Sequence, residues 1–258
     1  MPFFVGVDVG SISAKLAALY FPDGSSCDLS TLLCECAFSR AGQDSEGRIG
    51  LPFLLSKYRR TAGNPLQVVN ELLGNLASCL PEVKIRGIRV TGSGARLVAE
   101  ALDAHAENEF KAVARATRQL YPDVRTVFEI GGESSKYLRL AEDGGRLHTT
   151  GSDAGTFATG IADYSTSGEC AAGTGSFLDQ QASRLKYRVE EIGDIVAQAK
   201  CAARIAGRCS VFAKSDMIHA QQEGYSTHEV LKGLCEAVAR NFKSSIVRGK
   251  TVNPALPL

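Results

Sequence analysis

The sequence predicts an α/β protein built from two related domains. Three observations lead to this fold class. A strand–turn–strand unit occurs twice, apolar residues at helical spacing lie between and after the two copies, and the 258-residue chain is long enough for two ordinary domains. No apolar run approaches the roughly 18 residues that span a bilayer. We place the first domain at residues 1–121 and the second at residues 122–258.

Composition indicates a globular protein that has no nucleic-acid partner. Basic and acidic side chains are nearly balanced, 29 against 28, and 44% of the residues are hydrophobic. No basic stripe marks a nucleic-acid surface. The N-terminal sequence MPFFVGVDVG lacks the basic region and the cleavage site of a signal peptide, so we expect a cytoplasmic protein that is not bound to a membrane.

The repeat pairs residues 5–19, VGVDVGSISAKLAAL, with residues 126–140, TVFEIGGESSKYLRL, without a gap. In each copy an apolar strand delivers a carboxylate, a glycine lets the chain turn, and small hydroxyl residues followed by lysine open a return strand. A duplicated hairpin predicts two related α/β domains that face a shared cleft. The equivalent pairs are Asp8 and Glu129, Gly10 and Gly131, Ser13 and Ser134, and Lys15 and Lys136.

The chemistry of this hairpin suits a nucleotide. Lys15 can offset phosphate charge, and Asp8 can hold hydrated magnesium. Backbone N–H groups of the two turns can form concave anion sites, at Gly10, Ser11, Gly131 and Gly132. A glycine-containing hairpin without a ligand explains either copy taken alone. Two copies with the same carboxylate–glycine–hydroxyl–lysine order favour phosphate binding.

The remaining segments predict ordinary domain parts. Residues 64–80 and 107–121 have the apolar spacing of helices, and residues 84–102 are typical of a strand, a Thr-Gly-Ser-Gly turn and a helix. That turn can line the cleft. We expect an irregular surface excursion at residues 40–64 and a mobile Gly/Ser/Thr-rich loop at residues 151–169.

Two cysteines stand before predicted helices. Cys170 precedes GSFLDQQASRL, and Cys209 opens CSVFAKSDMIHAQQEG. A helix N-terminus favours the thiolate, which is the form that binds metal. Two thiolates are half of the set that an iron–sulfur cluster needs, and a twofold dimer or a second like unit can supply the rest. Burial as apolar cysteines is the alternative. We expect packing or loop positions for Cys27, Cys34, Cys36, Cys79, Cys201 and Cys235.

Five segments occur in order between residues 6 and 219, within a resemblance that runs from residue 3 to about residue 250: GVDVGSISAK, VTGSGAR, EIGGESSK, CAAGTGSFLDQQ and GRCSVFAKSDMIH. They resemble the motifs of ATP-dependent activators of 2-hydroxyacyl-CoA dehydratases, which are similar to the ATPase subunits of benzoyl-CoA reductases. This resemblance implies two ribonuclease-H-like domains of the superfamily that includes actin, sugar kinases and the large heat-shock chaperones.

The resemblance also implies an ATP hydrolase coupled to electron transfer, with Mg-ATP and a [4Fe-4S] cluster as cofactors. Cys170 and Cys209 occupy the cluster-ligand positions, two from each protomer of a homodimer or from each half of a fused pseudo-dimer. The implied donor is ferredoxin or flavodoxin, and the implied acceptor is a 2-hydroxyacyl-CoA dehydratase or reductase component.

Residue roles follow from the same resemblance. Asp8 and Glu129 are the implied catalytic residues, and Glu129 stands where many members have aspartate. The implied nucleotide-binding residues are Gly10, Ser11, Ser13, Lys15, Gly131, Gly132, Ser134, Lys136, Gly173, Thr174 and Gly175.

The final residues, IVRGKTVNPALPL, stand where we expect a further strand and a Gly-Gly turn over adenosine. The second domain is therefore expected to be incomplete, the chain to be the N-terminal portion of a long fused activator, and ATP binding to be weak. Two other functions fit parts of the sequence. An actin-like sugar or acyl kinase shares the hairpins but needs no cluster, and a non-catalytic dimerisation module needs neither.

Overall fold

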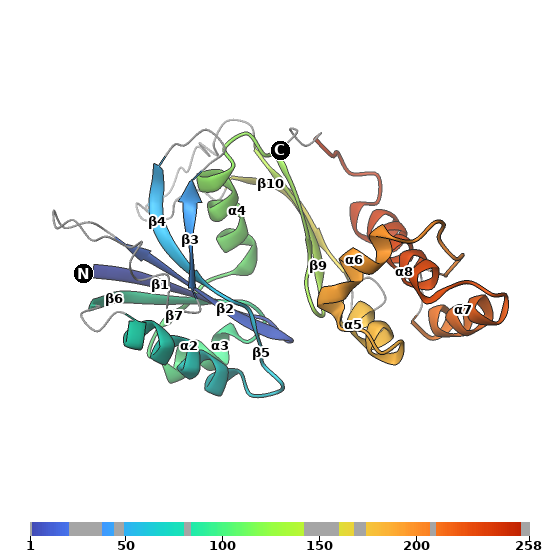
Figure 1. The fold of residues 1–258 in the computed structure, drawn as a ribbon. Coiled ribbons are helices and arrows are strands. Elements are labelled where there is room, and N and C mark those ends of the chain that lie inside the picture. The colour runs from blue at the N-terminus through green and yellow to red at the C-terminus, as the bar shows by residue number, and fades with distance from the viewer. Residues whose placement is uncertain are drawn as a thin grey trace. The chain divides into compact units, whose positions relative to one another are not determined.

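The computed structural model describes residues 2–20, 38–43, 49–79, 84–141, 160–167, 174–206 and 210–253. The chain forms two compact units, Met1–Val124 and Arg125–Leu258, each built from a sheet and helices (Figure 1). Within these described ranges, no helix combines the length and the hydropathy needed to cross a membrane. Several residues considered above lie outside the described ranges: Cys27, Cys34, Cys36, Cys170, Gly173 and Cys209.

A mixed sheet organises the first unit. Its strands run in the order β3-β4-β2-β1-β6-β7, and β5 pairs with β2. β1 is antiparallel to β2 and parallel to β6. The described strands are Pro2–Val9 (β1), Ser13–Tyr20 (β2), Phe38–Gln43 (β3), Ile49–Ser56 (β4), Arg59–Arg60 (β5), Lys84–Thr91 (β6) and His105–Ala106 (β7).

The helices described in the first unit are Pro65–Cys79 (α2), Ala95–Ala101 (α3) and Glu109–Leu120 (α4). Proline stands at the first position of α2, where no backbone donor is needed. The Asn108 side chain caps α4 by accepting the N–H groups of Phe110 and Lys111. Helices α2 and α3 lie on the same face of the sheet (Figure 1). The predicted helices and the predicted strand–turn–helix segment are confirmed.

Strand alternation determines which side chains form the core of the first unit. Four residues of β1 are buried, and the residues between them face the other way. Asp8 and Lys15 are both on the exposed face. Cys79 packs against the core, as expected, and it is also disulfide-bonded, which was not predicted. The core combines Phe3, Val5, Val7, Val9, Leu16, Val69, Leu72, Leu76, Val90 and Val98.

The expectation of an irregular excursion at residues 40–64 is wrong where this range forms β3, β4 and β5, and residues 44–48 lie outside the described ranges. β3 and β4 form an antiparallel hairpin, and β4 extends the sheet by pairing with β2. Leu54 and Ser56 of β4 are buried, and the Ser56 hydroxyl accepts the Leu16 N–H at 2.9 Å. Pro52 lies within β4 and cannot donate to a sheet, which disguises this strand in the sequence.

A small antiparallel sheet begins the second unit. Its order is β10-β9-β8, with Thr126–Ile130 as β8, Ser135–Leu140 as β9 and Ile161–Thr166 as β10. The mobile loop expected at residues 151–169 is therefore wrong for residues 161–166. Their burial alternates along β10, but glycine, serine and threonine together fill most of the neighbouring positions, and this composition is typical of a loop. Residues 151–159 and 168–169 lie outside the described ranges.

Helices form the rest of the second unit. The predicted helices after Cys170 and Cys209 are confirmed as Gly175–Arg184 (α5) and Ser210–Gln222 (α7). Further helical segments are Val189–Glu191 (η2), Ile192–Ala197 (α6), Thr227–Phe242 (α8) and the π-helical turn Lys243–Val247 (η3). Ser226 and Glu229 form a capping box that starts α8. Phe177, Met217, Val230, Leu231, Leu234 and Val238 are among the buried side chains that join α5, α7 and α8.

The segment after α8 is fastened to all three strands of the small sheet. Lys250 Nζ lies 2.5 Å from Asp163 on β10, and this ammonium lowers the pKa of the Asp163 carboxyl. Tyr137 of β9 donates its hydroxyl to the Thr251 carbonyl, and the Asn253 N–H donates to Thr126 at the start of β8. Residues 250–253 thus cross the sheet with one anchor on each strand.

Candidate functional site

The two copies of the repeat form hairpins with the same strand register. Asp8 lies opposite Lys15 across β1 and β2, and Glu129 lies opposite Lys136 across β8 and β9. Each acidic residue therefore has the repeat's lysine as its direct cross-strand neighbour. The sequence repeat is a repeat of backbone geometry as well.

The two turns are closed by the same hydrogen bond. Gly10 N–H donates to the Ser13 carbonyl at 2.9 Å, and Gly131 N–H donates to the Ser134 carbonyl at 2.8 Å. These two N–H groups are therefore engaged inside their own turns. Any anion bound at a turn must use the N–H groups that follow them.

In the first unit, the Thr-Gly-Ser-Gly turn packs against the end of β1. Gly92 has a φ of +98°, and a Cβ added there would stand 2.3 Å from the Val9 carbonyl oxygen and 2.8 Å from Oδ1 of Asp8. Gly94 N–H donates to the same carbonyl at 2.8 Å. Only glycine permits this approach to Asp8. The Lys15 ammonium, on the neighbouring strand, has no hydrogen-bond or ion-pair partner within the described part of the chain.

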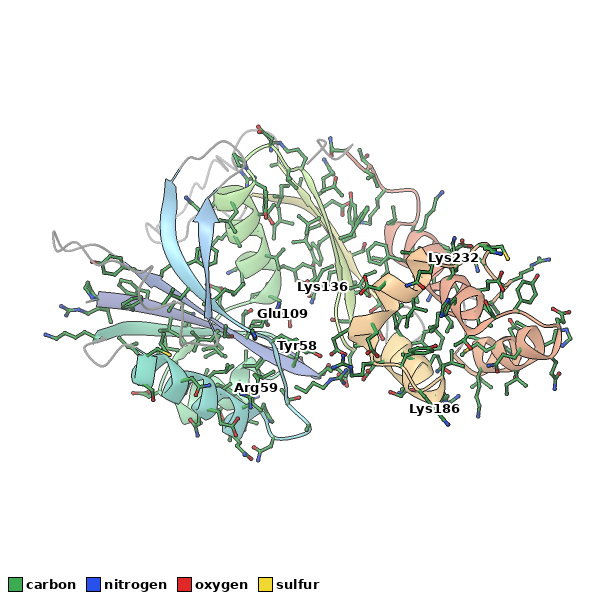
Figure 2. The ribbon with its side chains drawn as sticks, viewed as in Figure 1. Tyr58, Arg59, Glu109, Lys136, Lys186 and Lys232 are labelled. Atoms are coloured by element: carbon green, nitrogen blue, oxygen red, sulfur yellow. The ribbon has the colours of Figure 1, made fainter. Side chains whose placement is uncertain are left out.

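In the second unit, Lys136 and Glu129 form an ion pair. Nζ of Lys136 lies 3.0 Å from Oε1 of Glu129, and the side chains are 6% and 35% exposed (Figure 2 labels Lys136). Oε2 of Glu129 is buried and has no hydrogen-bond partner among the described residues. A buried acceptor left unpaired costs about 1–3 kcal/mol, so its presence calls for an explanation. A bound water or a hydrated cation would satisfy it.

The turn of the second hairpin is attached to the N-terminus of α5. Gly175 N–H donates to the Gly131 carbonyl at 2.8 Å, and Ser176 N–H donates to the Gly132 carbonyl at 2.9 Å. The Ser176 hydroxyl donates to that same Gly132 oxygen at 2.5 Å. The structure therefore brings Gly131, Gly132 and Gly175 together, with Thr174 fully buried beside them.

The turn of the first hairpin is attached to Thr61, which follows β5. Thr61 N–H donates to the Ile12 carbonyl at 2.8 Å, and its hydroxyl donates to the Ser11 carbonyl at 3.1 Å. Thr61 is 3% exposed. Neither Thr61 nor Ser176 was predicted from the sequence. Ser176 directly follows the Gly-Thr-Gly segment, which is a usable signal, whereas no motif marks Thr61.

The described residues hold no cluster of three or more potential metal ligands from His, Cys, Asp and Glu. Cys201 is exposed, and its thiol donates to Oε1 of Glu229 at 2.9 Å. This hydrogen bond, with two further ones from Ser226, lowers the pKa of Glu229 to about 2, and it raises the pKa of the Cys201 thiol. Cys235 is half-buried on α8, and burial raises its pKa.

Helix α7 presents apolar side chains to solvent near its start. Val211 and Phe212 are 67% and 65% exposed, and Ile218 is also exposed. The buried face of α7 instead carries Ala213 and Met217. The helix was predicted from Val211, Phe212 and Ile218, but these side chains are not the ones that it buries.

A cavity of about 650 Å³ lies beside the segment that leads to α7. Arg240 of α8 donates to the Ile205 carbonyl at 2.7 Å, and Asp216 of α7 accepts the Ala206 N–H at 2.7 Å. These charged side chains hold residues 205–206 between the two helices. None of the predicted nucleotide-binding residues that the structure describes lines this cavity.

Known proteins resemble this chain over most of its length. The 2-hydroxyisocaproyl-CoA dehydratase activator of Clostridioides difficile is 29% identical over 184 residues, which are 71% of this chain and 62% of that protein. The activator of lactoyl-CoA dehydratase from Anaerotignum propionicum is 31% identical over 142 residues, which are 55% of this chain and 49% of that protein. The matches thus span about half to two thirds of these curated relatives.

A solved structure confirms the α/β fold. The activator of the 2-hydroxyisocaproyl-CoA dehydratase from Clostridium difficile, with bound ADPNP, matches with a TM-score of 0.68 and 25% sequence identity. The match covers 97% of this chain and 77% of that chain. A family model described as the BadF/BadG/BcrA/BcrD ATPase family matches residues 5–256. The resemblance inferred from the motifs is therefore confirmed, and the chain belongs to the BadF/BadG/BcrA/BcrD ATPase family.

Proposed function

We propose that this chain binds Mg-ATP at its two hairpins and serves as the ATP-hydrolysing, electron-delivering part of an activator. The observation that carries the proposal is the repeated hairpin, in which an acidic residue faces the same lysine position in each unit. Carboxylate, lysine and turn N–H groups are the donors and acceptors that bind magnesium and phosphate. The ADPNP named for the matched activator structure supports a nucleotide as the ligand.

The proposed roles follow from each side chain's surroundings. Asp8, exposed beside the Gly92 turn, holds hydrated magnesium, and the Lys15 ammonium offsets phosphate charge. Glu129 orients the attacking water through Oε2, which is buried and unsatisfied, while Oε1 is held by Lys136. A positioned carboxylate of this kind serves as a general base. With Lys15, the proposed nucleotide-binding set comprises Gly10, Ser11, Ser13, Gly131, Gly132, Ser134, Lys136, Gly173, Thr174 and Gly175.

Cys170 and Cys209 are the proposed ligands of a [4Fe-4S] cluster shared with a second copy or a second like unit. Such a cluster, when bound, stores one electron at low potential. Support comes from the sequence, where each cysteine precedes a helix, and from the helices α5 and α7 that the structure describes after them. Exposed Val211 and Phe212 at the start of α7 favour an apolar contact with the second copy.

The proposed electron acceptor is a 2-hydroxyacyl-CoA dehydratase or a related acyl-CoA reductase component. The matched relatives are named as activators of dehydratases that act on CoA thioesters. We propose ferredoxin or flavodoxin as the donor, because either supplies single electrons. The chemistry of the hairpins does not depend on which donor is used.

Calorimetric titration with Mg-ATP tests the nucleotide part of the proposal. Lys15→Ala is expected to weaken binding about tenfold, since a charge-assisted phosphate contact contributes on the order of 1.5 kcal/mol. Lys84→Ala is the matched control, because Lys84 is exposed at the opposite end of the same sheet, where β6 begins beside Pro2. An unmodified chain that binds no Mg-ATP, or a Lys15→Ala variant that binds equally well, contradicts the proposal.

A further inference from the structure

The two turns are braced at equivalent positions by hydroxyl groups from elsewhere in their units. Ser11 and Gly132 occupy the same place in the repeat, directly after the turn glycine. The Ser11 carbonyl accepts the Thr61 hydroxyl at 3.1 Å, and the Gly132 carbonyl accepts the Ser176 hydroxyl at 2.5 Å. The repeat itself contains neither bracing residue. Both units nevertheless place a hydroxyl at the same carbonyl.

Each brace includes a backbone donor as well. Thr61 N–H donates to the Ile12 carbonyl, and Ser176 N–H donates to the Gly132 carbonyl. Both bracing residues belong to a segment that enters a helix after its hairpin: Thr61 precedes α2, and Ser176 lies in the first turn of α5. In the second turn, the Gly132 carbonyl accepts from both the N–H and the hydroxyl of Ser176. In the first turn, Thr61 holds two successive carbonyls, those of Ser11 and Ile12.

The braces determine where the next N–H group points. The described chain has no cis peptide bond, and in a trans peptide the C=O and the following N–H point in opposite directions. A Ser11 carbonyl fixed toward Thr61 therefore turns the Ile12 N–H away from Thr61. By the same geometry, a Gly132 carbonyl fixed toward Ser176 turns the Glu133 N–H away from α5.

Both of these N–H groups are available. Within the ranges that the structure describes, no hydrogen bond engages the N–H of Ile12 or of Glu133, whereas the N–H groups of Gly10 and Gly131 are used inside the turns. Ile12 is half-buried and Glu133 is exposed. An accessible, unengaged N–H in a turn is a donor for an anion.

We propose that Thr61 and Ser176 are positioning residues that hold the two turns in the conformation that binds phosphate. They hold the carbonyls of Ser11 and Gly132 toward themselves. The N–H groups of Ile12 and Glu133 then point the opposite way, which is the side where we place the phosphate. Without these hydrogen bonds the peptide can rotate and turn its carbonyl oxygen toward the phosphate, and the negative charges of the two groups repel each other. This inference rests on the proposed nucleotide site and assigns it two residues beyond the repeat.

The test uses the full chain and two probes, Mg-ATP and magnesium tripolyphosphate, titrated by calorimetry. Thr61→Val and Ser176→Ala each remove one hydroxyl and are expected to weaken both probes about tenfold, the effect of losing one hydrogen bond to an organised site. Thr61→Ser keeps the hydroxyl and is expected to bind within about twofold of the unmodified chain. Ser183→Ala, at an exposed position of the same helix α5, is the control for Ser176→Ala.

The outcomes separate this inference from the proposed function. If the unmodified chain binds neither probe, the proposed nucleotide site fails and the inference fails with it. If the unmodified chain binds both and Ser176→Ala binds them equally well, only the inference fails. A denaturation midpoint for each variant shows whether a weaker probe affinity comes from partial unfolding, and an affinity loss that Thr61→Ser shares with Thr61→Val overturns the role assigned to the Thr61 hydroxyl.

Discussion

Nζ of Lys136 lies 3.0 Å from Oε1 of Glu129, its cross-strand neighbour, and the other oxygen of that carboxylate is buried without a partner. Lysine is almost never this buried without a counter-charge, so the pair explains how Lys136 can be 5% exposed. The pair does not explain why Oε2 is withheld from water. One fixed and one unused carboxylate oxygen support the role that we propose for Glu129, which is to orient the attacking water.

Glu129→Gln is expected to preserve Mg-ATP binding and to reduce ATP hydrolysis about a hundredfold. The amide oxygen still accepts from Lys136, but the group can no longer take a proton from water, and a positioned general base contributes about 10²–10⁴ in rate. Single-turnover hydrolysis at saturating Mg-ATP measures the effect. Glu236→Gln is the matched control because Glu236 is exposed on α8, away from the turn. Equal hydrolysis by the two variants would remove Glu129 from the catalytic role.

Gly92→Ala is expected to destabilise the first unit by more than about 2 kcal/mol and to weaken magnesium-dependent binding. The new Cβ would overlap the Val9 carbonyl oxygen at 2.3 Å and press on Asp8, and the positive φ adds about 1 kcal/mol of strain. Urea denaturation gives the free energy of unfolding, and calorimetry gives the affinity.

Gly63→Ala isolates the strain from the collision. Gly63 also has a positive φ, +81°, but a Cβ added there meets nothing within 4 Å. It should therefore cost only the strain of about 1 kcal/mol and leave Mg-ATP binding unchanged. Similar losses for the two variants would show that the turn does not pack against Asp8 as tightly as described.

The hairpins were predictable because they are local. In VGVDV, alternate residues face the core, and the glycine, hydroxyl and lysine positions repeat in the same order, so the register of Asp8 with Lys15 follows from the pattern. β4 was missed because Gly50 and Pro52 contradict the usual strand composition. β10 was missed because IADYST is short and polar on one face.

Contacts between distant residues could not be predicted in this way. Thr61 reaches Ser11 across 50 positions, and Ser176 reaches Gly132 across 44. No local periodicity encodes such a pairing. Similarly, α7 carries apolar residues on more than one side, so the sequence predicted the helix but not that Val211 and Phe212 would be exposed while Ala213 and Met217 are buried. That choice is made by packing against α8.

Glu229 is expected to make stability depend on pH in acid. Folding lowers its pKa from 4.5 to about 2, so the ionised carboxylate stabilises the folded chain above pH 4.5, and this stabilisation is lost as the pH falls from 4.5 toward 2. The urea denaturation midpoints of the unmodified chain and of Glu229→Gln should differ above pH 4.5 and approach each other as the pH falls toward 2. Glu236→Gln, on the same helix, is the control. A gap between the curves that is constant with pH would contradict the assignment.

The same contact protects the Cys201 thiol. The Glu229 carboxylate raises the pKa of this thiol, and the thiolate is the form that reacts. Glu229→Gln should therefore speed iodoacetamide alkylation of Cys201 near pH 8, with Cys235 unaffected because burial alone raises its pKa. Mass spectrometry of the labelled peptides reads both sites in one sample. Unchanged labelling of Cys201 in Glu229→Gln would show that Glu229 does not raise the pKa of the Cys201 thiol.

The cysteines before α5 and α7 should carry the iron, and the two described free thiols should not. Cys170→Ser or Cys209→Ser is expected to abolish iron and acid-labile sulfide in protein purified without oxygen, because a four-thiolate set shared by two copies cannot lose one ligand from each.

Cys201→Ser and Cys235→Ser are the matched controls, since Glu229 holds the thiol of the first and α8 half-buries the second. We expect about two irons per chain in both controls, as one four-iron cluster per pair requires. The visible absorbance of the cluster and the iron assay should change together across the four variants. Full iron content in Cys209→Ser would remove the shared cluster, while its loss in Cys201→Ser would make Cys201 a ligand and break the equivalence between the two helix-preceding cysteines.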